Sequence, residues 1–253
     1  MLAKAICLVI ATTTNVLTWL PPPSSKTVAA KKEQKLVETE HAIVTTHANT
    51  FPLVMVAFSV SSCLIHLFFM FKNATASEGS SSWFNSNPAV TQVGDLHAWH
   101  VVLTVFCVLG YALRKWAYVT LDQLYTYQLT IRTEHKLIQT GPYAFVRHPG
   151  YAGMLLNVLS YSHLMFYRGA YSAVVQYISY LVPTFLGIKV SIPLTVMGFD
   201  LAAVQLVVYY YSWYLGAVKY RIPHEETLLK EHFGKEWDAF ASATHARLIP
   251  GVY

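Results

Sequence analysis

Charged residues are scarce in this sequence. Only 12% of its 253 residues are Asp, Glu, Lys or Arg, and 54% are hydrophobic, whereas ordinary globular proteins carry about 25% charged residues. This shortage excludes a typical soluble domain. We therefore expect a membrane protein of the all-α class, a polytopic bundle of transmembrane helices.

Cysteines and metal-ligand patterns are also few. Cys7, Cys63 and Cys107 each lie in an apolar run, without CxxC or Cys/His spacing. That spacing excludes a disulfide framework and a metal site, and it predicts small core residues. The net charge of +5 is spread along the chain, with no basic run interleaved with exposed aromatics. We expect neither a metal nor a nucleic-acid partner.

Long apolar runs are abundant. A membrane-crossing helix needs roughly 20 mainly apolar residues, and five segments qualify: 2–20, 51–71, 97–119, 153–167 when extended back to Pro149, and 194–218. The first reads as an anchor because no clear signal-peptidase site follows, although its cleavage stays open. The run within 168–193 is broken by Pro183 and Gly187, and we expect an interfacial or re-entrant sixth segment there.

The basic residues favour one side of these spans. With the N-terminus outside, 14 of the 18 Lys and Arg residues fall within 26–35, 114–147 and 219–247. The positive-inside rule places these regions in the cytosol. We expect one integrated membrane domain, with N-terminal spans and connectors in 1–119 and the functional region in 120–253.

The first polar stretch, residues 132–156, reads RTEHKLIQTGPYAFVRHPGYAGMLL. Gly141-Pro142 predicts a turn, and Pro149-Gly150 predicts a helix start directly after Arg147 and His148. A helix N-terminus offers free backbone N–H groups and partial positive charge. The sequence therefore predicts an anion-binding corner at the membrane surface.

The second polar stretch is KYRIPHEE at 219–226. Arg221 and Glu225 would share a face of a continuous helix, whereas Pro223 favours a helix start. The apolar residues of 228–240 follow at helical spacing and predict one helix covering the site. Two alternatives stay open: the arginines can be topology markers that snorkel into headgroups, and the glutamates can complement a helix dipole.

The two stretches together carry a composite pattern. The first contains H-x-L-x-x-x-G-x-Y-x-x-x-R-H-P-x-Y-x-G, from His135 to Gly153, and the second continues with Arg221, Glu225-Glu226 and Phe233-Gly234, before a terminal LIPG. Over about residues 120–253 the chain resembles the isoprenylcysteine carboxyl methyltransferase family. It departs from the family where Gly150 replaces a more usual serine and where Pro223-His224 stands in place of acidic residues.

The resemblance implies an activity and a site. Family members transfer a methyl group from S-adenosylmethionine to the carboxylate of a C-terminal prenylated cysteine, which here implies a multi-pass enzyme of the endoplasmic reticulum membrane with a cytosolic active site. Arg221 would hold the substrate carboxylate, with Arg147 as a second catalytic cation. The cofactor contacts would be Gln128, His135, Lys136, Leu137, Ile138, Tyr143, His148, Pro149, Gly150, Tyr151 and Glu225. The partners would be prenylated proteins or peptides and membrane lipid.

The chemistry of the residues agrees with this reading. A carboxylate is ionised at pH 7 and needs no general base to attack an activated methyl group, and an arginine can hold it bidentately. A phospholipid or other small-lipid methyltransferase on the same scaffold is the alternative enzyme, although Arg221 would not assist an amine nucleophile. We disfavour a sterol-type reductase, since no basic pocket for a 2′-phosphate is apparent. A membrane scaffold or channel would instead distribute polar residues over several spans.

Overall fold

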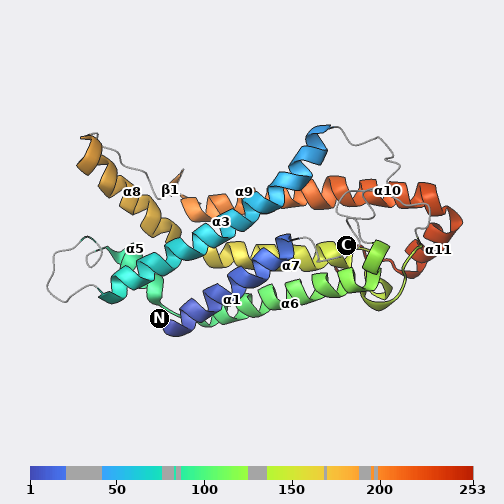
Figure 1. The fold of residues 1–253 in the computed structure, drawn as a ribbon, viewed down its shortest axis with the longest axis horizontal. Coiled ribbons are helices and arrows are strands. Elements are labelled where there is room, and N and C mark those ends of the chain that lie inside the picture. Colours follow the sequence, from blue (N-terminus) through green and yellow to red (C-terminus); the bar gives the residue numbers. More distant parts are fainter. Residues whose placement is uncertain are drawn as a thin grey trace. The chain divides into compact units, whose positions relative to one another are not determined.

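The computed structural model describes residues 1–20, 42–75, 83, 87–124, 136–167, 170–187, 195–196 and 199–252. Nearly all elements there are helical (Figure 1): α1 Leu2–Trp19, α3 Ala42–Thr75, α5 Pro88–Thr91, η1 Gln92–Gly94, α6 Ala98–Leu121, η2 Asp122–Leu124, η3 Gly141–Ala144, α7 Pro149–Phe166, α8 Ala170–Leu186, α9 Leu201–Trp213, the π-helix η4 Tyr214–Arg221, α10 Ile222–Phe233 and α11 Lys235–Ala243. An antiparallel pair, β1 Thr195–Val196 and β2 Phe199–Asp200, sets Thr195 opposite Asp200. The expected helical class is confirmed apart from this two-residue pair.

Three helices in the described part of the chain are long and apolar enough to cross a membrane. They are α1, residues Thr50–Thr75 of α3, and α6. The protein is thus a membrane protein, and three of the expected spans are confirmed. Helices α7 and α9 form within the other two candidate segments, and α8 forms within 168–193. That α7 and α9 cross the membrane, and that α8 is interfacial or re-entrant, stay predictions.

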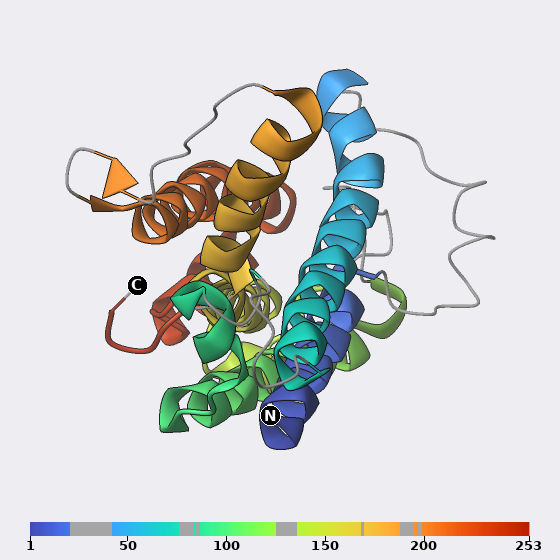
Figure 2. The ribbon, with the colours of Figure 1, turned by 90° about the vertical axis from the view of Figure 1, so that its left-hand side faces the viewer.

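The chain forms two compact units, which we describe separately. Unit 1 contains residues 1–15, 57–108 and 158–212, and unit 2 contains residues 16–56, 109–157 and 213–253. The core of unit 1 includes Cys63 and Cys107, as expected for small core residues. Its short α5 packs against α8 (Figure 2). At this contact the Asn87 side-chain amide donates to Gln176 Oε1. The expected division of the chain near residue 120 stays a prediction.

Buried hydroxyl groups link helices within unit 1. The Tyr161 hydroxyl donates to the Ser59 carbonyl at 2.7 Å, and the Ser59 hydroxyl donates to Asn15 Oδ1 at 2.8 Å. The Thr12 hydroxyl donates to the Tyr161 hydroxyl at 3.4 Å. Because lipid cannot satisfy polar groups, these contacts let α1, α3 and α7 carry them inside an apolar bundle.

In unit 2, α6 and α7 meet at two glycines. A Cβ on Gly153 would lie 2.5 Å from the Gly110 carbonyl oxygen, and a Cβ on Gly110 would lie 2.6 Å from the Gly153 carbonyl oxygen. Only residues without a side chain permit such close backbone approach. This crossing brings the first turn of α7 against α6 and so positions the candidate site.

The single helix expected over 228–240 is wrong. The structure has two helices, because Gly234 between α10 and α11 adopts φ = 53°, a conformation that glycine adopts at little cost. The Gly234 N–H still donates to the Lys230 carbonyl at 2.9 Å, and Lys230 Nζ lies 2.9 Å from Asp238 Oδ1. The expected helix start is confirmed, since Pro223 lies in the first turn of α10. That this region covers the site stays a prediction.

Candidate active site

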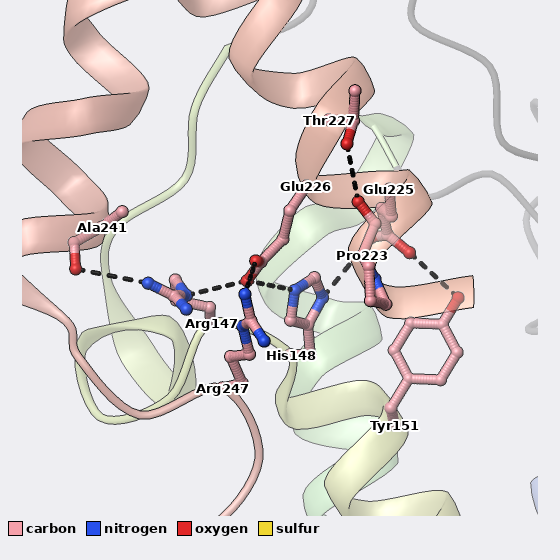
Figure 3. A network of polar contacts seen from close by, with 9 residues as sticks. All are labelled: Arg147, His148, Tyr151, Pro223, Glu225, Glu226, Thr227, Ala241 and Arg247. Carbon is pink, nitrogen blue, oxygen red and sulfur yellow. Dashed lines mark hydrogen bonds and ion pairs between the residues drawn. The ribbon is translucent and has the colours of Figure 1, made fainter. Parts of the chain in front are cut away.

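A polar network in unit 2 is centred on Glu226 (Figure 3). Its Oε1 lies 2.9 Å from Arg147 Nε and 3.2 Å from His148 Nε2, and its Oε2 lies 2.9 Å from Arg247 Nη2. The Glu226 and Arg147 side chains are only 12% and 11% exposed. At this burial, ion pairs are little screened by solvent, so Glu226 holds three cationic groups close together.

A second contact set is centred on the Tyr151 hydroxyl. This hydroxyl accepts a hydrogen bond from Arg221 Nε at 2.8 Å and donates one to Glu225 Oε2 at 2.9 Å. His148 Nδ1 lies 3.7 Å from Glu225 Oε1 and connects the two sets. Arg221 and Glu225 therefore meet at one hydroxyl, although Arg221 ends the π-helix and Glu225 lies in α10.

The C-terminal tail holds the start of α7 in place. The Arg147 N–H donates to the Ala246 carbonyl and the His148 N–H to the Arg247 carbonyl, each at 2.9 Å. Pro149 then begins α7, where its missing N–H costs nothing. The tail carbonyls thus occupy the backbone amides of the two residues before the helix. That the helix N-terminus and these two side chains form an anion-binding corner stays a prediction.

Burial and charge act in opposite directions on the ionisable groups. Burial alone would lower the pKa of His148, but the contacts with Glu225 and Glu226 and their negative charges outweigh it and raise that pKa. Burial would likewise raise the pKa of Glu225 and Glu226, but the His148 contacts and the arginine charges hold both pKa values below the ordinary value. The network favours two carboxylates around an imidazolium.

The structure places the predicted site residues unequally. His148, Pro149, Gly150 and Tyr151 lie together at the start of α7 and approach Glu225 and Arg221, whereas Gln128 and His135 lie outside the described residues. Lys136, Leu137 and Ile138 lie in the segment before η3, which contains Tyr143. None of the hydrogen bonds and ion pairs given above for Glu226 and Tyr151 involves these four residues.

The turn before α7 is fixed by a glycine, as Gly141-Pro142 predicted. Gly141 has φ = 61°, and a Cβ there would lie 3.1 Å from Thr120 Oγ1. The turn therefore packs closely against the end of α6. This contact positions η3, and with it Tyr143, relative to the helix that also supports the start of α7.

Sequence reasoning missed two participants. It gave Glu226 no role in the site beyond complementing a helix dipole, and it used Arg247 only as a marker of topology, yet the two form an ion pair. The signal available was the terminal LIPG element, which follows Arg247 directly. Its place in the family pattern pointed to the tail as part of the site.

Comparisons with known proteins bear on the family resemblance. The model of the isoprenylcysteine carboxyl methyltransferase (ICMT) family matches residues 102–190, which include the start of α7. The predicted resemblance is confirmed. Arg221, Glu225, Glu226 and Arg247 lie beyond the segment matched by the ICMT model, so their grouping with His148 and Tyr151 is an independent observation of the structure.

The chain is also similar to named plant proteins. Two proteins named probable protein-S-isoprenylcysteine O-methyltransferase, from Oryza sativa subsp. indica and subsp. japonica, are each 28% identical over 148 residues, covering 57% of this chain and 58% of the relative. Protein-S-isoprenylcysteine O-methyltransferase B of Arabidopsis thaliana is 28% identical over 136 residues, covering 53% and 51%. The chain thus spans somewhat over half the length of these relatives. No solved structure matches it significantly.

Proposed function

We propose that the protein uses S-adenosylmethionine to methylate the carboxylate of C-terminal isoprenylcysteine. The observation that carries the proposal is the meeting of Arg221 and Glu225 at the Tyr151 hydroxyl, at 2.8 and 2.9 Å. The family resemblance assigns these positions to substrate and cofactor. Their adjacency supports a site in which the two reactants meet.

Arg221 is the proposed carboxylate-binding residue. Its guanidinium is oriented by the hydrogen bond from Nε to Tyr151, and the planar fork of an arginine can hold a carboxylate through two parallel hydrogen bonds. Holding the anion in this way fixes the attacking oxygen in line with the methyl group. Such positioning reduces the entropic part of the barrier.

Glu225 and its neighbours fit the cofactor chemically. Its depressed pKa makes it an ionised acceptor for amino or hydroxyl groups, and the rings of Tyr143 and Tyr151 offer flat apolar surfaces. Gln128, His135, Lys136, Leu137, Ile138, Pro149 and Gly150 would complete this surface. When bound, S-adenosylmethionine would supply an electrophilic methyl group on a sulfonium, which a carboxylate can attack without a general base.

Arg147 has a different proposed role from Arg221. Its Nε lies 2.9 Å from Glu226 Oε1, and its Nη1 donates to the Ala241 carbonyl at 3.3 Å. We therefore assign Arg147 to positioning instead of contact with the reacting atoms. Its side chain connects the segment directly before α7 to both α10 and α11.

The membrane has a place in this proposal. A prenyl chain prefers hydrocarbon, so the substrate tail can stay among the apolar helices while its carboxylate reaches Arg221. The cofactor is polar and comes from water. We place the site at the cytosolic face of the endoplasmic reticulum membrane, following the distribution of basic residues and the family resemblance.

The test is methyl transfer by the purified protein in detergent, with labelled S-adenosylmethionine and N-acetyl-farnesylcysteine. We expect a base-labile methyl ester. If phosphatidylethanolamine is labelled and no ester forms, the result supports the phospholipid alternative. If neither acceptor is labelled, both the proposed activity and this alternative fail.

Two variants divide the roles within the site. Arg221→Ala should raise KM for the prenylcysteine or lower kcat, with little change in the affinity for S-adenosylmethionine. Glu225→Ala should mainly weaken the binding of S-adenosylmethionine. Lys219→Ala is the matched control, since Lys219 is an exposed cation beside the ring of Tyr220, at 5.9 Å. Equal losses of cofactor affinity in both site variants would contradict this division.

A further inference from the structure

Helix α6 contains a buried arginine that the proposed chemistry does not use. Arg114 is 7% exposed, although its place near the end of an apolar span suggested a topology marker that snorkels into headgroups. A charged group inside a membrane protein is costly unless it is fully bonded, and it is functional by default when its partners can be named. The structure names the partners of Arg114.

Arg114 joins two helices through their backbones. Its Nε donates to the Thr18 carbonyl at 2.9 Å, and its Nη1 donates to the Gly150 carbonyl at 3.1 Å. The guanidinium carbon also lies 4.7 Å from the centre of the Tyr118 ring. The last carbonyls of a helix lack partners within the helix, so Arg114 satisfies a carbonyl near the end of α1 while holding the first turn of α7.

The glycine crossing explains why Arg114 reaches this turn. A Cβ on Gly153 would lie 2.6 Å from the Arg114 backbone nitrogen, so the backbone of α6 touches α7 at Arg114 itself. Gly150 lies one turn earlier on α7. The short distance between the helix axes thus lets the side chain bond a carbonyl that faces it directly.

Gly150 lies between two residues of the candidate site. His148 contacts Glu226 at 3.2 Å, and Tyr151 contacts Glu225 at 2.9 Å and Arg221 at 2.8 Å. Hydrogen bonds of this length tolerate displacements of only a few tenths of an ångström. Movement of the Gly150 carbonyl would therefore change the contacts that His148 and Tyr151 make with the two glutamates and Arg221.

We infer that Arg114 is a positioning residue for the methyl-transfer site: it fixes the first turn of α7 against α1 and thereby sets where His148 and Tyr151 meet α10. The kinetic consequence rests on the proposed function, whereas the structural consequence does not. Arg114 touches neither reactant in this assignment. It acts through the Gly150 backbone.

The experiment compares Arg114→Met and Arg114→Lys with the control Lys115→Met, all as full-length protein in detergent. Lys115 is the neighbouring cation on the same helix and is exposed. Hydrogen–deuterium exchange should accelerate at residues 150–153 in Arg114→Met, about 10- to 100-fold for the loss of charge-assisted hydrogen bonds. Lys115→Met should exchange like the wild type. Arg114→Lys should be intermediate, since an ammonium lacks the planar fork.

Kinetics provide the second readout. Arg114→Met should raise KM for S-adenosylmethionine or lower kcat per folded molecule, with the Lys variant in between. If Arg114→Met does not fold, the Lys variant alone decides. Lower thermal stability with unchanged exchange at residues 150–153 and unchanged KM would show a merely structural role and overturn the inference.

The exchange measurement separates this inference from the proposed function. If the wild type forms no methyl ester, the proposed activity fails, but accelerated exchange confined to the start of α7 would still support positioning by Arg114. If the ester forms and both Arg114 variants match the wild type in exchange and kinetics, the activity stands and the inference fails.

Discussion

The contact between α6 and α7 makes two identical substitutions behave oppositely. At Gly150, the one atom of the described residues that an added Cβ would meet within 4 Å is Ala117 Cβ, at 3.8 Å, which is ordinary van der Waals contact. At Gly153, three residues later on the same helix, it would lie 2.5 Å from the Gly110 carbonyl oxygen and 2.6 Å from the Arg114 nitrogen. Gly150→Ala should therefore be accepted, whereas Gly153→Ala should force the helices apart.

The expected magnitudes follow from these distances. Replacing glycine with alanine inside a helix stabilises the folded state by roughly 0.5–1 kcal/mol. Gly150→Ala should therefore raise the free energy of unfolding by up to that amount. Gly153→Ala has the same gain but adds overpacking, which typically costs about 1–3 kcal/mol and occasionally more. The upper part of that range applies, because both contacted atoms belong to a helix backbone and cannot rotate away. We expect a net loss of about 1–2 kcal/mol.

Thermal unfolding in detergent, followed by intrinsic fluorescence, measures the difference. For a chain of this size, about 1 kcal/mol corresponds to roughly 2–4 °C in the unfolding temperature, so Gly153→Ala should unfold several degrees below Gly150→Ala. Gly216→Ala is a control in the π-helix, since a Cβ there would meet no atom of the described residues within 4 Å. Equal unfolding temperatures for the Gly150 and Gly153 variants would refute the close crossing, and with it the placement of Arg114 against Gly150.

The polar network leads to two further predictions. Glu226→Gln keeps the side-chain shape but leaves Arg147 and His148 without their anion. We expect the free energy of unfolding to fall by on the order of 2–3 kcal/mol, less than the roughly 3–5 kcal/mol for a fully buried pair, because the Arg247 side chain is 34% exposed. An unchanged unfolding temperature would contradict the role of Glu226. The pH dependence has a defined sign. The raised pKa of His148 stabilises the folded protein fully below about pH 6.5, and this stabilisation is lost as the pH rises through the pKa of His148 in the folded state. The lowered pKa values of Glu225 and Glu226 stabilise the folded protein above about pH 4.5, and this stabilisation is lost on acidification. The stability difference between the wild type and His148→Gln, measured by thermal unfolding across pH 5–9, should narrow at high pH, and a constant difference would argue against an imidazolium.

The local features were those that the sequence predicted best. Pro149 and Pro223 mark helix starts because a proline has no N–H to lose there, and Gly141 marks a turn that needs positive φ. Apolar length identified α1, the later part of α3, and α6 as spans. Each of these inferences depends on a few neighbouring residues, and the physics that decides them is equally local.

The unpredicted features depend on contacts between distant parts of the chain. The tail carbonyls of Ala246 and Arg247 bond amides about 100 residues earlier, and no pattern within either segment encodes that pairing. Helical periodicity across 228–240 also hid the break at Gly234, since an isolated glycine is tolerated within a helix at about 1 kcal/mol. For Arg114, the positive-inside rule counts charges along the chain but says nothing about which way a side chain points.

The balance of charge in the site favours an acidic acceptor over an amine. Three guanidinium groups, those of Arg147, Arg221 and Arg247, lie among two carboxylates, those of Glu225 and Glu226. On the proposed function, this excess of positive charge would attract the substrate carboxylate and would repel the ammonium of phosphatidylethanolamine.

The same excess must stay moderate. Methyl transfer from a sulfonium to a carboxylate cancels both charges, so a site that bound the anion too strongly would stabilise the ground state more than the transition state. The Tyr151 hydroxyl joins Arg221 to Glu225 and thereby keeps a negative charge close to the guanidinium. On the proposed function, Tyr151 limits how strongly Arg221 holds the carboxylate while keeping it in line.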